Sequence, residues 1–268
     1  MTPASPDIWS PSFRKVRLTD CRPHATRQRM ALPCAILAAM QLTVFAASSL
    51  RDAFQELGQL FETEHAGAAV SFNFAGSQQL RTQIEHGARA DVLASADERH
   101  MRALVDADLA VAPRTFARNE PVIVVPAGNP AAIHALLDLP RAQRIVVGAP
   151  AVPIGAYTLR ILEAASSRYG PGFRAEVEAR IASRELNVRQ VLAKVRLGEA
   201  DAAIVYRTDA LAAREAVETI SIPADLDVVA EYPIALLRGA SQPQLARAFI
   251  DLVLSPAGRA LLERHGFR

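Results

Sequence analysis

Apolar and polar positions follow two regular patterns from residue 42 onward. Short apolar or alternating runs predict strands, and apolar residues three or four positions apart predict amphipathic helices. In the first half these patterns predict strands at 42–46, 70–74 and 91–95 and helices at 49–64, 77–86 and 97–107. In the second half they predict strands at 121–126, 144–148, 201–206 and 228–237 and helices at 156–168, 188–197, 242–254 and 256–265.

Strands that alternate with helices indicate a parallel sheet covered by helices. The 268 residues suit one large domain or two lobes of about 100 residues each. We therefore expect an α/β protein of two lobes with a cleft between them. Two strand-like crossings, near Pro121 and Pro233, would link the lobes.

Charge is distributed unevenly along the chain. Residues 1–40 hold six basic and two acidic side chains, and the rest of the chain holds 24 basic and 26 acidic ones. A nucleic-acid-binding protein would be expected to keep a basic face on its folded part. The near-neutral body therefore argues against a nucleic-acid partner.

The first 40 residues form a predicted leader. Residues 1–29 are rich in Pro, Ser, Thr and Arg and predict disorder, or an extension upstream of the true start codon. The apolar run at 30–40 follows Arg27 and Arg29 and resembles the start of a secretory signal. This favours export to the periplasm, although Pro33 interrupts the run and no clear cleavage site follows. The alternative is a cytoplasmic protein that begins near Met40.

Several kinds of catalytic site are not predicted. Both cysteines, Cys21 and Cys34, lie in the leader, which excludes a thiol catalyst or a cysteine zinc site in the body. The six histidines have no metal-ligand spacing, and neither a phosphate-binding loop motif nor a G-x-S-x-G motif occurs. We therefore expect a binding protein and not an enzyme, without a bound metal cation.

Small or hydroxyl residues recur at predicted helix starts. They occur at Ser48-Ser49, Gly76-Ser77, Pro153-Ile154-Gly155 and Asn187-Val188. The first N–H groups of a helix have no intrahelical acceptor, and the helix dipole makes that end partly positive. Several such ends in one cleft would bind an anion without lysine or arginine. Each serine alone is more often only a helix cap, and Tyr206 alone is more often a packing aromatic than a donor to an anion.

The body resembles the periplasmic molybdate-binding proteins of ABC transporters. The resemblance covers the chain from about residue 42 to its end. It rests on ordered stretches at 44–50, 74–80, 83–97, 152–157, 187–189, 198–206 and 231–233. It implies a two-lobed type II periplasmic-binding-protein fold, in which each lobe is a mainly parallel sheet flanked by helices and the ligand cleft lies between the lobes. The implied limits are 1–40 for the leader, 41–120 with 233–268 for lobe 1, and 121–232 for lobe 2.

The resemblance also implies which groups hold the oxyanion. These are the hydroxyls of Ser49 and Ser77, the backbone amides of Ile154 and Val188, and the hydroxyl of Tyr206. Two positions depart from the family pattern, since Ile154 is bulkier than expected and Gly76 stands where serine is common. The implied partners are a small oxyanion and a membrane permease. We expect a monomer with no cofactor apart from the ligand itself, molybdate or tungstate.

The donor set bears on the choice of oxyanion. Serine, tyrosine and amide groups donate hydrogen bonds and do not titrate near pH 7. The ligand segments contain no obvious carboxylate, which disfavours a protonated ion such as hydrogen phosphate. Sulfate uses the same donors and differs mainly in size, so a sulfate-binding protein is one alternative. A cytosolic oxyanion-sensing module is the other.

Overall fold

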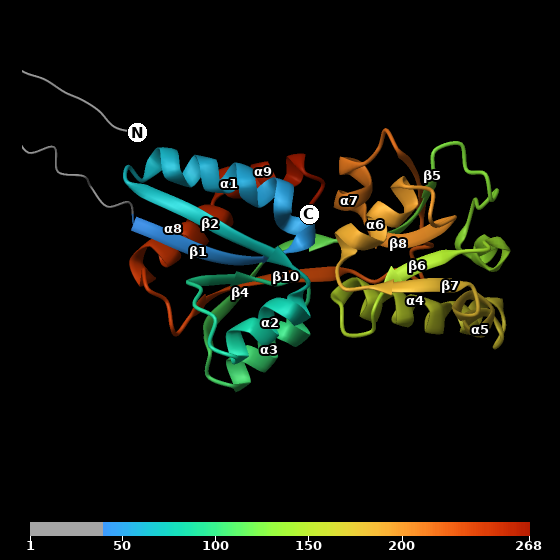
Figure 1. Ribbon diagram of the computed structural model, residues 1–268, viewed down its shortest axis with the longest axis horizontal. Coiled ribbons are helices and arrows are strands. Elements are labelled where there is room, and N and C mark those ends of the chain that lie inside the picture. The colour runs from blue at the N-terminus through green and yellow to red at the C-terminus, as the bar shows by residue number, and fades with distance from the viewer. Residues whose placement is uncertain (1–39) are drawn as a thin grey trace, which may run out of the picture. The chain divides into compact units, whose positions relative to one another are not determined.

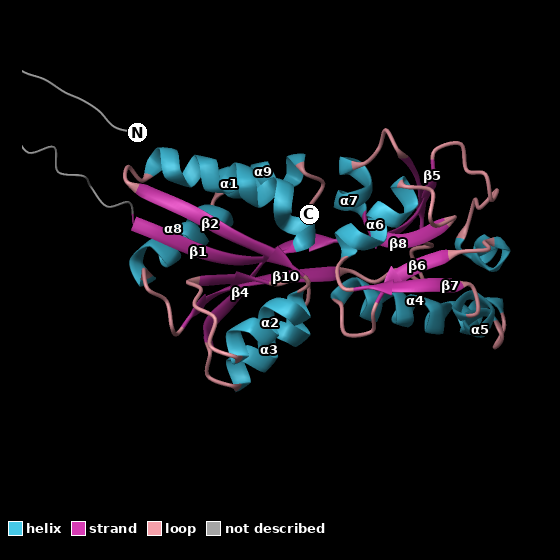
Figure 2. Ribbon diagram, viewed as in Figure 1, coloured by secondary structure: helices cyan, strands magenta, loops and turns pink. Residues whose placement is uncertain are grey.

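The computed structural model describes residues 40–268, and the predicted leader lies outside the described residues except for Met40. The described part contains two five-stranded sheets, each with helices on both faces (Figures 1 and 2). The first sheet and its helices are called the first lobe below, and the second sheet and its helices the second lobe. This arrangement confirms the predicted two-lobed α/β fold.

The first sheet has the strand order β2-β1-β3-β10-β4. Its strands are β1 (Met40–Ala47), β2 (Ala68–Ala75), β3 (Val92–Ala94), β4 (Ala110–Asn119) and β10 (Ala230–Leu237). One face carries α1 (Arg51–Glu64), which follows the short helix η1 (Ser48–Leu50), together with α8 (Pro243–Leu254) and α9 (Pro256–Arg264). The other face carries α2 (Ser77–Glu85) and α3 (Glu98–Asp106) (Figure 1).

The second sheet has the strand order β7-β6-β8-β5-β9. Its strands are β5 (Pro121–Pro126), β6 (Ile145–Gly148), β7 (Ile181–Glu185), β8 (Ala202–Tyr206) and β9 (Val217–Ser221). Its helices are η2 (Leu136–Arg141), α4 (Pro153–Tyr169), α5 (Phe173–Glu178), α6 (Val188–Arg196) and α7 (Arg207–Ala212). Helices α4 and α5 pack together, as do α6 and α7, on opposite faces of the sheet (Figure 1).

Both sheets are mixed and not mainly parallel. In the first sheet, β1 pairs in parallel with β2 and β3, while β10 pairs antiparallel with β3 and β4. In the second, β6 pairs in parallel with β7 and β8, while β5 pairs antiparallel with β8 and β9. The antiparallel pairs arise from the strands next to the crossings, because a chain that leaves a sheet and later returns to it enters in the opposite direction.

The chain passes between the sheets twice. It leaves the first sheet at Asn119 and enters the second at Pro121, so that only Glu120 separates the two strands. It leaves the second sheet at Ser221 and re-enters the first at Ala230. The limits proposed from the sequence, at 120/121 and 232/233, remain predictions.

Successive side chains along a strand point to opposite faces of the first sheet, and both faces are packed with buried apolar residues. Val44 and Val92 belong to the main core with Phe54 and Phe249 of α1 and α8, whose rings lie 6.0 Å apart, edge to face. Phe45 and Leu93, one position further along, belong to a second cluster with residues of α2 and α3. Each buried side chain of this size contributes roughly 1.5–3 kcal/mol, so the strands that carry the site are held firmly from both sides. No helix among residues 40–268 is long and apolar enough to cross a membrane.

Candidate functional site

A small cavity lies where strand ends and helix starts of the two lobes meet. It encloses about 200 Å³ of empty space, which includes its opening to solvent. The enclosed space is far too small for a drug-sized molecule, so the cavity suits only a small ligand such as an ion. All five residues predicted from the sequence line it. The lining residues are Ala47, Ser48, Ser49, Ala75, Gly76, Ser77, Ala96, Val152, Pro153, Ile154, Asn187, Val188 and Tyr206.

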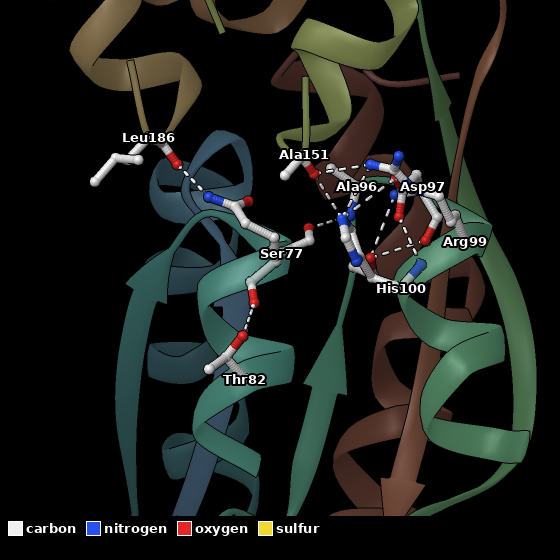
Figure 3. Close-up of polar contacts among 10 residues, drawn as sticks. Ser77, Thr82, Ala96, Asp97, Arg99, His100, Ala151 and Leu186 are labelled. Carbon is white, nitrogen blue, oxygen red and sulfur yellow. Dashed lines mark hydrogen bonds and ion pairs between the residues drawn. The ribbon is translucent and has the colours of Figure 1, made fainter. Parts of the chain in front are cut away.

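The first lobe supplies the two predicted serines. Ser49 lies in η1, which directly follows β1, and Ser77 is the first residue of α2, separated from β2 by Gly76 alone. Both are buried. The Oγ atom of Ser77 accepts a hydrogen bond from the backbone N–H of Ala96 at 3.0 Å (Figure 3). A backbone N–H can only donate, so it uses a lone pair of the Ser77 oxygen and not the hydroxyl proton. That proton is available to a ligand in the cavity.

The second lobe supplies two backbone amides. Ile154 is the second residue of α4, after Pro153, and Val188 is the first residue of α6. The Asn187 side chain caps α6 by accepting from the N–H of Gln190 at 3.1 Å, which fixes the helix start. The N–H groups of Ile154 and Val188 therefore have no intrahelical acceptor. They lie at the positive ends of the two helix dipoles, where an anion is favoured.

Tyr206, the last residue of β8, supplies a hydroxyl that lacks a protein partner. Its side chain is 1% exposed, and its OH group has no hydrogen-bond partner among residues 40–268. Burial raises the pKa of Tyr206 well above its ordinary value, so the group stays protonated and remains a donor. A buried hydroxyl without a partner is costly, and an anion in the cavity would satisfy it.

The cavity wall carries no ionisable carboxylate or basic side chain within the described residues. Its polar groups are hydroxyls, backbone amides and the amide of Asn187. A carboxylate would repel a dianion and could select a protonated one, whereas this wall offers an anion mainly donors. The arrangement therefore favours a small anion that is fully ionised at neutral pH, held without a counter-ion.

Contacts between the lobes close around the cavity. The side-chain amide of Gln78 donates to the carbonyl of Leu186 at 2.7 Å. The Nη2 atom of Arg99 and the Nε2 atom of His100 each lie 2.8 Å from the carbonyl oxygen of Ala151 (Figure 3). Because a carbonyl only accepts, His100 donates through Nε2. Burial lowers the pKa of His100, which keeps its ring neutral at pH 7.

A further contact between the lobes involves Arg189, which follows the predicted ligand residue Val188. Its guanidinium donates to Asp52 of α1 at 2.6 Å and forms an ion pair with Asp209 of α7 at 2.9 Å. Asp209 is fully buried, and burial raises its pKa to about 6, although Arg189 opposes the shift. Sequence reasoning gave Arg189 and Asp209 no role, because they lie on two different helices, α6 and α7, and no motif or periodicity links the two positions.

Two glycines allow the backbone to approach closely at the cavity. A Cβ atom on Gly155 would overlap the carbonyl oxygens of Ala149 and Gly148, so α4 can begin this close to β6 only with glycine there. A Cβ atom on Gly76 would overlap the carbonyl oxygen of Leu186 in the second lobe. The departure from serine at Gly76 therefore coincides with a tight contact between the lobes.

Known proteins show related sequences and folds. The molybdate-binding protein ModA of Mycobacterium tuberculosis is 42% identical over 231 residues, which covers 85% of each chain. The periplasmic molybdate-binding protein of Azotobacter vinelandii is 20% identical with a TM-score of 0.71, covering 85% of this chain and 98% of that one. The sulfate-binding protein SubI of M. tuberculosis is 20% identical with a TM-score of 0.76, covering 85% and 86%.

The two structural likenesses, at these identities, show the fold alone. The sequence match to the mycobacterial protein is closer and extends over most of both chains. The family model described as bacterial extracellular solute-binding protein matches residues 42–268, which include both lobes and every residue that lines the cavity. The chain therefore belongs to the family of bacterial extracellular solute-binding proteins that includes the molybdate-binding proteins ModA.

Proposed function

We propose that this protein captures molybdate or tungstate and delivers it to the membrane permease of an ABC transporter. The observation that carries the proposal is the buried Tyr206 hydroxyl, which faces a small cavity and has no protein partner among residues 40–268. The relative that matches most of the chain at 42% identity is named for molybdate binding. It is a binding protein by name, which supports a role in binding and not in catalysis.

Capture depends on both lobes. The first lobe offers the hydroxyls of Ser49 and Ser77, and the second offers the amides of Ile154 and Val188 and the hydroxyl of Tyr206. Neither lobe alone surrounds the ion. We propose that the open protein admits the ion and that closure about the crossings at Glu120 and at 222–229 completes the shell. The contacts of Gln78 and Arg189 across the cleft would then hold the closed form.

The donor set supports molybdate or tungstate over phosphate. Hydrogen phosphate carries a proton that needs an acceptor, and the cavity wall has no carboxylate within the described residues. Sulfate is also fully ionised and would use the same donors. The likeness to the sulfate-binding protein SubI shows the fold alone, so sulfate enters as a competitor in the test.

A thermal-shift panel with molybdate, tungstate, sulfate and phosphate tests the ligand. A ligand at 1,000 times its Kd stabilises a protein by about 4 kcal/mol. For a folded part of this size, that corresponds to a rise in Tm on the order of 10 °C. We expect this rise with molybdate and tungstate and little change with phosphate. A clear rise in Tm with sulfate, and none with molybdate or tungstate, would show that the ligand is sulfate. No rise with any oxyanion would contradict the proposed function.

Affinity for molybdate is expected to be nearly independent of pH between about pH 7 and 9. The wall has no side chain that titrates in this range, because burial raises the pKa of Tyr206 far beyond it. Isothermal titration calorimetry at several pH values measures the dependence. If affinity instead fell about tenfold for each unit by which the pH rises, one proton would be taken up on binding. A titrating group would then contact the ion.

The family also bears on location and assembly. Its members are described as extracellular solute-binding proteins. We propose that this chain acts in the periplasm as a monomer, after export directed by the residues before Met40. Two features of the sequence support export: the basic residues Arg27 and Arg29, and the apolar run that follows them.

A further inference from the structure

Tyr232 lies directly behind one of the proposed ligand residues. It belongs to β10, is completely buried, and does not line the cavity. Its hydroxyl lies 3.0 Å from Oγ of Ser49, and either atom could donate in that hydrogen bond. The same hydroxyl lies 3.5 Å from Nδ2 of Asn119, at the end of β4. The direction of the Tyr232–Ser49 hydrogen bond decides whether Ser49 can donate to an anion.

The side chain of Asn119 fixes one end of this chain of hydrogen bonds. The backbone N–H of Glu120 can only donate, and it donates to Oδ1 of Asn119 at 2.9 Å. The amide nitrogen of Asn119 must therefore face the other way. It donates to Oγ1 of Thr208 at 2.9 Å and to the hydroxyl of Tyr232. The Tyr232 hydroxyl oxygen thus accepts a hydrogen bond from Asn119 and cannot donate one back, because the amide nitrogen is not an acceptor.

The proton of Tyr232 consequently has one recorded acceptor among the described residues, Oγ of Ser49. A buried hydroxyl needs an acceptor, so Tyr232 donates and Ser49 accepts. The proton of Ser49 is then turned toward the cavity. Building on the proposed function, we infer that Tyr232 and Asn119 are positioning residues. They orient the Ser49 hydroxyl as a donor to the captured oxyanion.

The hydroxyls of Ser49 and Ser77 are therefore oriented by different hydrogen-bond donors. The acceptor side of Ser77 is occupied by a backbone N–H, that of Ala96, which cannot reverse its direction. Ser49 has a tyrosine hydroxyl in that place, and a hydroxyl can rotate. Asn119 removes this freedom. Hydrogen bonds in such a chain also polarise one another, so each donor upstream strengthens the last one.

Tyr232→Phe tests the inference, because it removes the hydroxyl and keeps the ring. We expect molybdate affinity, measured by calorimetry, to fall about 5- to 10-fold, the scale of one net hydrogen bond. Tyr169→Phe is the matched control. It removes a tyrosine hydroxyl at the far end of α4 and is expected to leave the affinity unchanged.

Combining Tyr232→Phe with Ser49→Ala separates positioning from a general structural effect. If Tyr232 acts through Ser49, Tyr232→Phe costs nothing further once the Ser49 hydroxyl is gone. An equal loss in both backgrounds would overturn the inference, because the tyrosine would then act by another route. Unchanged affinity for Tyr232→Phe alone would overturn it as well. If the wild-type protein binds no oxyanion, the proposed function itself fails, which the same titration shows first.

Asn119→Asp provides a second variant that tests the direction directly. A carboxylate has the same shape but accepts, so it would draw the Tyr232 proton away from Ser49. We expect a larger loss of affinity than for Tyr232→Phe. In the Tyr232→Phe background the same substitution shows the effect of the added charge and of the lost donation to Thr208, without the effect on the Tyr232 proton. A loss of the same size in both backgrounds would contradict the orienting role of Asn119.

Discussion

Tyr206→Phe is expected to weaken molybdate binding by about 10- to 100-fold and to leave the ligand-free protein at least as stable as the wild type. The lost contact is a hydrogen bond to a charged group, which is worth about 1.5–3 kcal/mol. The free protein loses nothing comparable, because the hydroxyl has no protein partner among residues 40–268. Calorimetry gives the affinity, and thermal melting without ligand gives the stability.

Ser77→Ala serves as the comparison for this prediction. Ser77 also offers a hydroxyl to the cavity, but its Oγ atom already accepts from the N–H of Ala96. Its removal should lower both the affinity and the stability of the free protein, since the Ala96 N–H is left without that acceptor. If Tyr206→Phe instead destabilised the free protein and left affinity unchanged, Tyr206 would be a packing residue and the site would need another donor.

Arg189→Leu is expected to destabilise the protein by about 3–5 kcal/mol near pH 8. This is the usual cost of removing one partner of a buried ion pair. Asp209 is fully buried, and Arg189 is the cation that faces it at 2.9 Å. Chemical denaturation measures the loss. Arg184→Leu, which removes an exposed arginine of β7, should change stability by less than about 0.5 kcal/mol.

The effect of Arg189→Leu should depend on pH in a defined direction. Burial raises the pKa of folded Asp209 to about 6, above its ordinary value of 3.8, so the folded protein binds this proton more tightly than the unfolded chain does. The stability linked to Asp209 is therefore fully present below about pH 4 and is lost as the pH rises through 6. Without Arg189 the pKa of Asp209 rises further, and the deficit of the variant should be smaller at pH 5 than at pH 8.

Asp209→Asn tests the same explanation from the other side. In the Arg189→Leu background it removes the unpaired carboxylate and should restore part of the stability at pH 8. A deficit that is equal at both pH values, and that Asp209→Asn does not relieve, would mean that the Asp52 contact or packing accounts for the loss.

The apolar pattern predicted the interior of both sheets and missed most of their edges. The central strands β1, β3, β5, β6, β8 and β10 all coincide with predicted segments. The three missed strands, β4, β7 and β9, are three of the four edge strands. Each shows several exposed positions, and β4 also contains Pro113. An edge strand packs on fewer neighbours and so lacks the apolar run by which strands are recognised. The fourth edge, β2, was found because its residues alternate.

The lining of the candidate cavity was predictable where a residue marks a helix start, whereas a residue that acts only through a contact was not. Ser49, Ser77, Ile154 and Val188 follow strands in the sequence, and the fold brings them to one cavity. Tyr232 was part of a stretch that resembled the family, but its contact with Ser49 spans 183 positions. A periodicity extends over about ten residues, so it cannot report a pair of this kind.

The late position of β10 constrains the order in which the chain can be completed during synthesis. The second sheet is built from one continuous segment, 121–221, and has all its strands once that segment has emerged. The first sheet must wait, because β10 inserts between β3 and β4 and is made nearly last. Until residue 237 is translated, β3 and β4 have no common neighbour. The amino-terminal half of the protein is therefore the last to become a finished structure.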